Sequence, residues 1–393
     1  MFVKVVNVTK GSSLTEITIP DPSWGSDLAN IILDLEKLRT KQLGGDVPPY
    51  IFFQLKELFQ ILETIGSARI EGNNTTLSEY VEKIIEECSE DEQSREIRNL
   101  EHAIHYIEES LEKGVPIDRA FISDVHRILT DRLSPPPTGE GSRYPGDLRE
   151  NEVAIKNSGH TPPAPMMLPE YFEAFISFIN AEHKEQYQLL MVAIAHHRFE
   201  YIHPFDNGNG RMGRLLNYAL LIKLGFQVRN GRILNPSSVF YTDRDRYYDM
   251  LSRADSLKAE DLLAWSEYFL SGMKNELEKI DSLLRFEYVR DELLLPMLHS
   301  AKERQYVTEL EHKILVYLVN KEDMSIKSSE LERFGISGSR QKSYTITKLR
   351  NKKMISPTKE GGRIYTISFG NSYLLRTIME VLDQKGFVSE FLK

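Results

Sequence analysis

The stretch His203-Pro204-Phe205-Asp206-Asn207-Gly208-Asn209-Gly210-Arg211-Met212-Gly213-Arg214 decides how this 393-residue chain is interpreted. It gathers one imidazole, three glycines and two arginines within twelve residues, and an apolar helical pattern follows it. Glycines permit the positive φ angles and the close backbone approach that an anion nest needs. The following helix would direct its N–H groups and the positive end of its dipole at the anion. The stretch therefore predicts a polyphosphate site beside a titratable side chain.

The residues of this stretch have separate expected roles. Gly208, Asn209 and Gly210 lie where the loop must turn into the helix. Arg211 and Arg214 are three residues apart, so both are expected on one side of the first helical turn. Two guanidinium groups in that place suit a ligand with several phosphates.

The imidazole of His203 lies just before the loop. An imidazole is neutral near physiological pH and is suited to take a proton from an attacking hydroxyl. His196 and His197 raise the question of a metal site, but their spacing with His203 matches no standard zinc signature. We expect these two residues to pack against the preceding helix or to cap it. The Gly-Lys-Ser/Thr ending of a P-loop is missing, which excludes that class of nucleotide site.

The composition is that of an ordinary soluble protein, with 41% hydrophobic and 27% charged residues. A net charge of −9 excludes a surface built as a whole for polyanions. The single cysteine, Cys88, excludes an intramolecular disulfide and fits a reducing compartment. No segment approaches the roughly 18 apolar residues of a membrane span, and residues 1–13 lack the layout of a signal peptide. We therefore expect a cytoplasmic protein with no membrane contact.

Most of the chain carries apolar residues at helical spacing, so the expected fold class is mainly α. One buried stripe precedes Gly72, which is expected to cap that helix at its C-terminal end; the stripe consists of Leu55, Leu58, Phe59, Leu62 and Ile65. Further helices are expected at about 76–88, 93–112, 117–132, 169–182, 184–200, 209–224, 243–253 and 259–286.

Residues 133–169 interrupt the helical pattern with prolines and glycines. Within them, Glu152–Lys156 is a short segment with the β-branched residues Val153 and Ile155 two positions apart, and Asn157-Ser158-Gly159 follows it, which predicts a short β-hairpin. Loops of this length inside a compact domain are usually functional.

The chain changes character from about residue 305. Three helices are expected at 309–320, 327–334 and 337–353, followed by strands at 354–356 and 364–367. This order is typical of a winged helix-turn-helix domain. Residues 338–363 contain eight basic residues and one acidic residue, which favours binding to a phosphate backbone. A protein-interaction module or a solvated basic helix would show the same composition.

The twelve-residue stretch resembles the motif of Fic-domain proteins, His-x-Phe-x-Asp/Glu-Gly-Asn-Gly-Arg-x-x-Arg. The resemblance implies a Fic-type helical bundle and a nucleotidyltransferase that moves AMP from ATP to a hydroxyl side chain (Ser, Thr or Tyr) of a target protein, releasing pyrophosphate with the help of Mg²⁺. His203 would then be the general base and Phe205 the anchor of the loop. Gly208, Asn209 and Gly210 would form the anion hole, and Arg211 and Arg214 would hold the outer phosphates.

One position departs from the family pattern. The family's magnesium-binding carboxylate falls on Asn207, while Asp206 comes one residue early. An amide oxygen can ligate Mg²⁺ but contributes no charge. The related Doc-type proteins, which transfer a phosphate, resemble this chain at this position. They usually lack the intact Gly-Asn-Gly-Arg, so AMP transfer is favoured and a Doc-like phosphotransferase is the alternative.

A second stretch, Ser67-Ala68-Arg69-Ile70-Glu71-Gly72, resembles the family's inhibitory motif Ser/Thr-x-x-x-Glu-Gly/Asn. In similar proteins this glutamate pairs with the second arginine of the catalytic motif. Glu71 would thus turn Arg214 away from the γ-phosphate, with Ser67 in the same motif. The resemblance implies an enzyme that is autoinhibited in cis.

Two looser matches complete the resemblance. Val153, Ala154, Ile155 and Lys156 match the family's flap, which docks the target as an added strand, and Tyr248 matches a tyrosine near the adenine. The expected domains are 1–110, carrying the inhibitory motif, 111–290, the Fic catalytic domain, and 300–393, the winged helix, for which DNA is the expected partner. The sequence leaves open a homodimer, and also a transcription regulator whose Fic-like domain only senses nucleotide.

Overall fold

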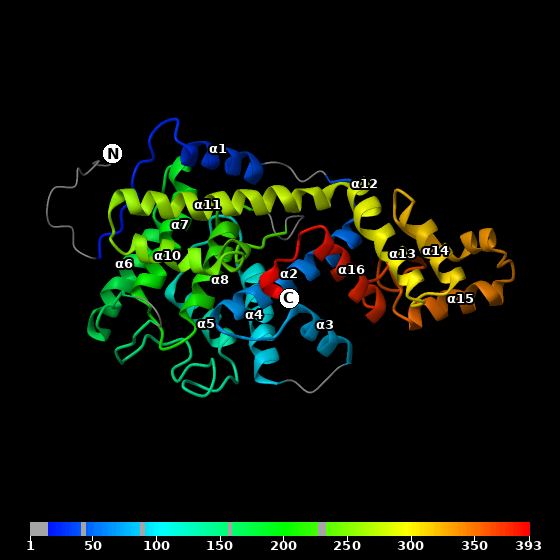
Figure 1. Cartoon of the computed structure of the whole chain (residues 1–393), viewed down its shortest axis with the longest axis horizontal. Coiled ribbons are helices and arrows are strands. Elements are labelled where there is room, and N and C mark those ends of the chain that lie inside the picture. The colour runs from blue at the N-terminus through cyan, green and yellow to red at the C-terminus, as the bar shows by residue number, and fades with distance from the viewer. Residues whose placement is uncertain (1–14, 41–44, 87–90, 156–158, 227–232) are drawn as a thin grey trace. The chain divides into compact units, whose positions relative to one another are not determined.

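The computed structural model describes residues 15–40, 45–86, 91–155, 159–226 and 233–393, and these are mainly helical (Figure 1). Cys88 and Lys156 lie outside the described residues. Within the described part of the chain, no helix is both long enough and apolar enough to cross a bilayer.

The chain divides into two compact units that are each discontinuous in sequence. The first unit is drawn from Met1–Thr40, Glu92–Phe226 and Asp243–Lys274, and the second from Lys41–Asp91, Gln227–Thr242 and Asn275–Lys393. This division does not follow the three consecutive ranges 1–110, 111–290 and 300–393. The difference arises because compact units are built by side-chain packing, which brings together segments that are distant in sequence.

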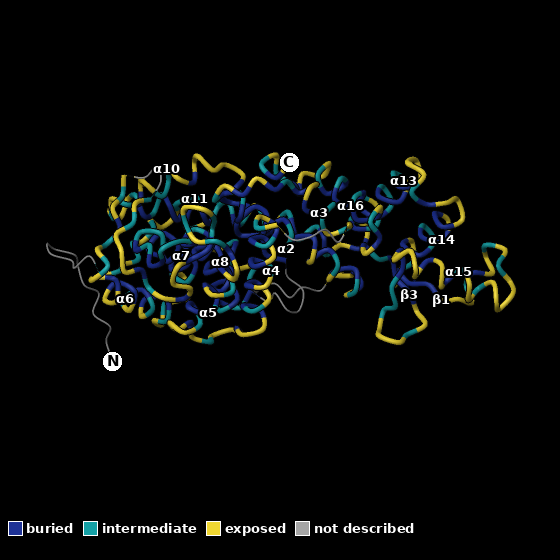
Figure 2. Tube along the Cα trace, turned by 90° about the horizontal axis from the view of Figure 1, so that it is seen from below, coloured by how far each residue is buried: buried dark blue, intermediate teal, exposed yellow. Residues whose placement is uncertain are grey.

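In the first unit, two central helices carry the candidate site. Helices α7 and α8 pack on each other, α7 also packs on α6, and α4 packs on α5 and α8. Helix α8 is buried along almost its whole length, and α7 is buried from Leu189 to Phe199 (Figure 2), as expected for helices that are surrounded by others. The helices of this unit are α1 (Asp27–Thr40), α4 (Glu92–Ser110), α5 (Arg119–Leu129), α6 (Leu168–Asn180), α7 (Glu185–Ile202), α8 (Asn209–Lys223), α10 (Arg244–Ala254) and the first part of α11 (Ala259–Asp281).

Each helix expected for this unit is present, with its ends shifted by a few residues. The expected β-hairpin is wrong for the residues that can be checked. Residues 152–155 form no strand, and residues 156–158 lie outside the described residues. A hairpin of two short strands is at best marginally stable by itself, and Pro162 and Pro163 cannot donate a ladder hydrogen bond to it.

The second unit is organised around α2 (Pro49–Glu71), which starts after Pro48 and ends at Gly72. Gly72 has a φ of 112° and donates its N–H to the carbonyl of Arg69, so the expected glycine cap is confirmed. The remaining elements of this unit are α3 (Leu77–Glu86), α9 (Ser238–Tyr241), η2 (Ser282–Leu284), α12 (Phe286–Tyr288), the π-helix η3 (Val289–Leu294), α13 (Leu295–Glu303), α14 (Glu309–Val319), β1 (Ser325–Lys327), η4 (Ser328–Phe334), α15 (Ser339–Asn351), β2 (Ile355–Pro357), β3 (Ile364–Ile367), α16 (Ser372–Gln384) and η5 (Glu390–Leu392).

A small antiparallel sheet lies near the end of the chain in strand order β1-β3-β2. Ser325 pairs with Thr366 across β1 and β3, and Ile355 pairs with Ile367 across β2 and β3. The two expected strands are present, and β1 is a further strand that the sequence did not predict. The segment expected as a helix at 327–334 is a 3-10 helix, η4.

Helix α2 is joined to this sheet by a side-chain amide. Gln54 donates from Nε2 to the carbonyl of Ile367 at 3.0 Å and accepts at Oε1 from the N–H of Phe369 at 2.8 Å. The end of β3 is therefore held to α2 by two hydrogen bonds.

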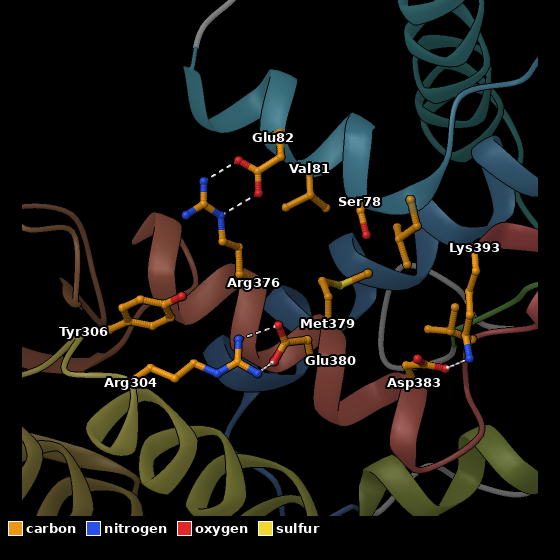
Figure 3. Close-up of a pocket in the computed structure, with 12 residues that line it drawn as sticks. Ser78, Val81, Glu82, Arg304, Tyr306, Arg376, Met379, Glu380, Asp383 and Lys393 are labelled. Atoms are coloured by element: carbon orange, nitrogen blue, oxygen red, sulfur yellow. Dashed lines mark hydrogen bonds and ion pairs between the residues drawn. The ribbon is translucent and has the colours of Figure 1, made fainter.

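Helices α3 and α16 flank a cavity of about 180 Å³ whose apolar lining includes Leu77 and Met379. Figure 3 shows three ion pairs around it: Glu82 with Arg376, Glu380 with Arg304, and Asp383 with Lys393. Each charge drawn there has an opposite charge beside it, so the cavity lies between partly exposed ion pairs.

Candidate active site

His203 ends α7 in an unusual backbone conformation. Its φ of 50° and ψ of 61° lie in the left-handed region, which residues other than glycine rarely adopt. Its N–H donates to the carbonyl of Phe199 at 2.9 Å and so closes the helix. Backbone strain of this kind persists only where the surroundings hold it, and it gathers at functional sites.

Phe205 anchors the loop after His203, as expected. Its side chain is 1% exposed. The ring stacks on the imidazole of His126 with centroids 3.8 Å apart, and it also contacts Phe199 and Phe172. The side chain of Phe205 therefore anchors the loop in the hydrophobic core of the first unit.

Asn209 closes the loop with its side chain. Its Oδ1 accepts from the N–H of Phe205 at 2.9 Å, and its Nδ2 donates to the carbonyl of Phe205 at 2.8 Å. Both polar atoms of this buried amide are thus engaged inside the protein. Any contribution of Asn209 to an anion hole must come from its backbone N–H.

The start of α8 has the backbone expected of an anion site. Gly208 precedes the helix with a φ of 77°, and its carbonyl accepts from the N–H of Met212. Asn209 and Gly210 are the first two residues of the helix. The first N–H groups of a helix have no partner within the helix, which is why helix N-termini bind anions.

His126 is a fully buried residue that holds the loop from the other side. Its Nε2–H donates to the carbonyl of Asn207 at 3.0 Å, and its Nδ1 accepts from the N–H of Gly146 at 2.8 Å. These two bonds require the neutral ring with the proton on Nε2. Burial lowers the pKa of His126 to about 4, in agreement with a neutral ring.

The acidic residue of the motif has a structural role. Asp206 accepts from the hydroxyl of Ser142 through Oδ1 and from the N–H of Arg143 through Oδ2. Asn207 donates its amide N–H to the carbonyl of Gly141 at 3.0 Å. Its Oδ1 is therefore the only side-chain atom of Asn207 that can ligate a cation. Among the residues that the structure describes, no three His, Cys, Asp or Glu side chains gather as they would around a metal ion.

Arg211 has partners that the sequence did not indicate. Its side chain is fully buried, and Nη1 donates to Oε1 of Glu96 at 2.7 Å. Nη2 donates to the carbonyl and to the carboxylate of Glu140 at 2.8 and 3.2 Å. A buried guanidinium needs such partners because an unpaired buried charge is very costly. The structure thus ties Arg211 to α4 and to the 131–151 loop, and phosphate binding by this residue stays a prediction.

Arg214 is 1% exposed and lies in the second turn of α8. Burial, with a further contribution from the positive charge of Arg214, lowers the pKa of the nearby His196 to about 3. The two neighbouring histidines of α7 are fully buried, with His196 bonded to the Tyr247 hydroxyl at 2.9 Å and His197 to Asp255 at 3.0 Å. The expectation that these histidines pack inside the protein is confirmed.

The tyrosine pair on α10 has two different environments. Tyr247 is buried against His196, whereas Tyr248 is 40% exposed and has the guanidinium of Arg244 over its ring. The exposed ring of Tyr248 is the one that a ligand can reach, and its contact with adenine stays a prediction.

The segment that was expected to dock the target protein begins a few residues after the buried Arg149. Val153, Ala154 and Ile155 are at least partly exposed and form no strand, and Lys156 lies outside the described residues. Arg149, which is 3% exposed, donates to the carbonyls of His203, Asn151 and Pro163. Burial lowers the pKa of Arg149.

The inhibitory motif lies at the end of α2, in the second unit. Ser67 and Glu71 are one helical turn apart, and Ser67 is buried. The last turns of this helix are tightly packed, because a Cβ at Gly66 would lie 2.1 Å from the ring of Tyr241. Arg69 lies over the ring of Phe391 at 5.3 Å.

Part of the basic cluster in 338–363 is already neutralised. Lys342 pairs with Glu332, and Lys348 and Lys352 both approach Oε1 of Glu311, at 3.6 and 2.7 Å. The basic residues that stay exposed with no ion pair in the described structure are Arg340, Arg350, Lys353, Lys359 and Arg363, and of these Arg350 lies over the ring of Tyr365.

The sequence interpretation missed His126, Arg149, Glu96 and Glu140. These residues lie between 54 and 115 positions from their partners in the motif, so no local spacing connects them. The one signal was the length of the 133–169 loop, which contains Glu140 and Arg149.

Known proteins share the central part of this chain. Residues 116–221 match the Fic/DOC family. The protein adenylyltransferase Fic of Drosophila virilis is 30% identical over 194 residues, which is 48% of this chain and 36% of the fly protein. The protein of the same name from Drosophila ananassae is 30% identical over 200 residues, or 50% of this chain and 36% of its own length. This chain therefore spans about a third of the length of the curated relatives it matches.

A crystal structure of a Fic family protein from Desulfovibrio desulfuricans has a similar fold. It matches with a TM-score of 0.54 at 19% identity and covers 89% of this chain and 98% of that chain. At this identity the likeness concerns the fold alone.

Proposed function

We propose that this chain, which carries a Fic domain at residues 116–221, transfers AMP from ATP to a hydroxyl side chain of a protein. One observation carries the proposal. The turn that joins His203 to the start of α8 is closed by Asn209 and held from outside by His126 and Arg149. A base and an anion-binding helix end are thus fixed by one rigid turn, as an in-line transfer requires.

In the proposed step, His203 takes the proton of the target hydroxyl. The hydroxyl oxygen forms a bond to the α-phosphorus of ATP while the bond to the β-phosphate oxygen breaks, so pyrophosphate leaves with its electron pair. The backbone N–H groups at the start of α8 stabilise the charge on the phosphates. The products are the AMP-modified protein, pyrophosphate and a protonated His203.

The residues present do not form a charged magnesium site. Both oxygens of Asp206 are engaged by Ser142 and Arg143, and Asn207 offers one neutral oxygen. The carboxylate of Glu140, which lies beside Asn207, pairs with Arg211. No step of the proposed mechanism is therefore routed through Mg²⁺.

We further propose that Glu71 inhibits the enzyme in cis. The position of Glu71 at a capped helix end, one turn after the buried Ser67, agrees with the inhibitory motif that the sequence resembles. A carboxylate at the C-terminal end of a helix is mildly unfavourable against the helix dipole, so a cationic partner such as Arg214 would stabilise it.

The experiment compares ATP labelled on the α- or the γ-phosphate, incubated with the Glu71→Gly protein and a cell lysate. The signal of interest is the label that is lost when His203→Ala is added to the Glu71→Gly protein, because kinases of the lysate label proteins from γ-labelled ATP in every sample. We expect this His203-dependent label only from α-labelled ATP. His203-dependent label from γ-labelled ATP would instead show the Doc-like phosphotransferase that Asn207 favours. Equal labelling by wild type and Glu71→Gly would reject the inhibition by Glu71.

A second function is proposed for the end of the chain. The order α14, β1, η4, α15, β2, β3 agrees with a winged helix-turn-helix, with α15 as the recognition helix and the β2–β3 hairpin as the wing. Arg340, Lys359 and Arg363 would contact DNA phosphates. A mobility shift of the full chain on duplex DNA that weakens with salt would support this proposal, and no shift at low salt would reject it. A cytoplasmic location, a homodimer and a role as a transcription regulator stay predictions.

A further inference from the structure

The cavity between α3 and α16 lies in the second unit, and none of its lining residues takes part in the proposed AMP transfer. Its volume is about 180 Å³. A cavity of about 150 Å³ with an apolar lining is large enough to bind benzene, so this one has room for an apolar side chain. Four buried apolar residues, each at most 7% exposed, form part of its lining: Leu77, Val81, Met379 and Val388.

One ion pair at the cavity joins its two helices. Arg376 of α16 donates from Nε to Oε1 of Glu82 of α3 at 2.6 Å, and it also donates from Nη2 to Oε2 (Figure 3). The side chains of Arg376 and Glu82 are 30% and 40% exposed. Ion pairs that are exposed to this degree contribute little to stability. A ligand can therefore separate Glu82 from Arg376 at low cost.

The chemistry of this ion pair defines the ligand that suits it. Arg376 holds Glu82 through two parallel contacts, which is the geometry in which a guanidinium binds any carboxylate. The carboxylate of a ligand can take the place of Glu82 on Arg376, and an ammonium group of the same ligand can pair with Glu82. A ligand with only a carboxylate would leave Glu82 without its cation. The pair thus favours a zwitterion, and the apolar lining favours one with an apolar side chain.

The other charges of the lining agree with a ligand that has no net charge. Arg304 pairs with Glu380 at 2.7 Å, and Lys393 pairs with Asp383 at 2.9 Å. Three basic and three acidic side chains therefore line the cavity, and their charges cancel. A lining of this kind attracts neither an anion nor a cation over a zwitterion.

Helix α3 is firmly connected to the end of α2 that carries Glu71. Arg69 of α2 donates from Nη1 to the carbonyls of Asn74 and Thr75 at 3.2 and 3.1 Å. The N–H of Thr75 donates to Oδ1 of Asn73 at 2.9 Å. These bonds fix the turn between Glu71 and the start of α3. A movement of α3 is therefore passed on to the end of α2.

We infer that the cavity between α3 and α16 binds an α-amino acid with an apolar side chain, and that this ligand relieves the inhibition by Glu71. The amino acid places its carboxylate on Arg376 and its ammonium group on Glu82, so its head group lies between the two residues and moves α3 away from α16. Its side chain occupies the apolar part of the cavity. The regulatory part of this inference rests on the proposed function, whereas the binding does not.

The binding is tested by calorimetric titration of the full chain with leucine, methionine and phenylalanine. At least one of them should bind with a Kd below about 1 mM. For leucine, the analogues leucinamide, which lacks the carboxylate, and 4-methylpentanoate, which lacks the ammonium group, should each bind about 10-fold more weakly or less. Failure of all three amino acids to bind, or equal binding of 4-methylpentanoate and leucine, would overturn the inference.

Three variants show whether the ligand occupies this cavity. Arg376→Gln should weaken binding about 10-fold or more. The matched control is Arg290→Gln, because Arg290 contacts Asp291 through the same two atoms with similar exposure but lies outside the lining; binding should not change. Ser78 is an exposed residue of the lining, so Ser78→Trp should fold, fill the cavity and abolish binding. Unchanged binding by both Arg376→Gln and Ser78→Trp would place the ligand elsewhere and overturn the inference.

The regulation is tested in a dialysed lysate with α-labelled ATP. The amino acid that binds should raise His203-dependent labelling by the wild type toward the level of Glu71→Gly, and should leave labelling by Glu71→Gly unchanged. An equal rise in both proteins, or no rise in the wild type, would reject the coupling to Glu71. If Glu71→Gly labels nothing, the proposed function fails instead, and the titrations still decide whether the cavity binds an amino acid.

Discussion

Replacing Gly66 with alanine measures how tightly the last turns of α2 are packed in the second unit. Helix propensity alone favours alanine over glycine by about 1 kcal/mol in a helix interior. The structure reverses this sign, because a Cβ at Gly66 would lie 2.1 and 2.2 Å from Cδ1 and Cε1 of Tyr241. That ring is buried and stacks on Phe391, so it cannot turn away freely. Overpacking costs about 1–3 kcal/mol, and the upper end applies at such a separation. The net loss is then about 2 kcal/mol.

The assay is urea unfolding of Gly66→Ala in three backgrounds: native, Tyr241→Phe and Tyr241→Val. The first replacement keeps the ring and the second removes it, while both lose the hydrogen bond from Asn235 to the Tyr241 hydroxyl. Gly66→Ala should destabilise by about 2 kcal/mol in the native and Tyr241→Phe backgrounds. In the Tyr241→Val background the propensity gain of about 1 kcal/mol should emerge.

The reasoning is refuted by either of two results. If Gly66→Ala in the native background were more stable than wild type, the Tyr241 ring would move aside without loss of stability. The same destabilisation in all three backgrounds would mean that the cost has another source than Tyr241.

Burial lowers the pKa of His196 to about 3 from 6.5, so its neutral form contributes stability that is complete above pH 6.5 and is lost as the pH falls toward 3. Urea unfolding should show about 2 kcal/mol less stability at about pH 5 than at about pH 7.5, and an unchanged pH dependence in His196→Asn would contradict this. Glu96→Ala should cost about 3–5 kcal/mol because it leaves the buried guanidinium of Arg211 without its closest carboxylate. Glu140→Ala removes the other partner of Arg211, which is 43% exposed, and should cost less than about 1 kcal/mol. Equal losses of unfolding free energy for Glu96→Ala and Glu140→Ala would show that burial of the ion pair does not set its contribution to stability. Gly208→Ala must place a side chain at a φ of 77° and should lower the unfolding free energy by about 1–2 kcal/mol, and no loss would show that the turn relaxes.

Features of the fold that depend on residues close together in the sequence were predicted from the sequence. The loop from His203 to Gly208, the start of α8 and the glycine cap of α2 follow from spacing and residue type, and the structure contains all three. The helix expected at 327–334 is present as the 3-10 helix at 328–334, whereas the strand β1, whose partner is the distant β3, was not predicted.

The contacts that the sequence did not indicate are formed between residues far apart in the chain. Arg211 was predicted to bind phosphate because it and Arg214 are three residues apart at the start of a helix, whereas its contacts in the structure come from Glu96 and Glu140. Asn209 looked like part of an anion hole, whereas its amide is used to close the turn at Phe205. The division into units was missed for the same reason, since Gln54 bonds to residues more than 300 positions away.

The bond between Gln54 and the end of β3 has a consequence for the order in which the protein is made. Residues 92–274 leave the ribosome before residue 367 is synthesised, and domains generally fold as units during synthesis. Contacts that span 313 residues form late, because a long loop must close first. We therefore expect the first unit of a nascent chain to be complete while α2 still lacks its partners in the sheet. The newly made protein would pass through an interval in which the segment carrying Glu71 is present but not yet held in its final place.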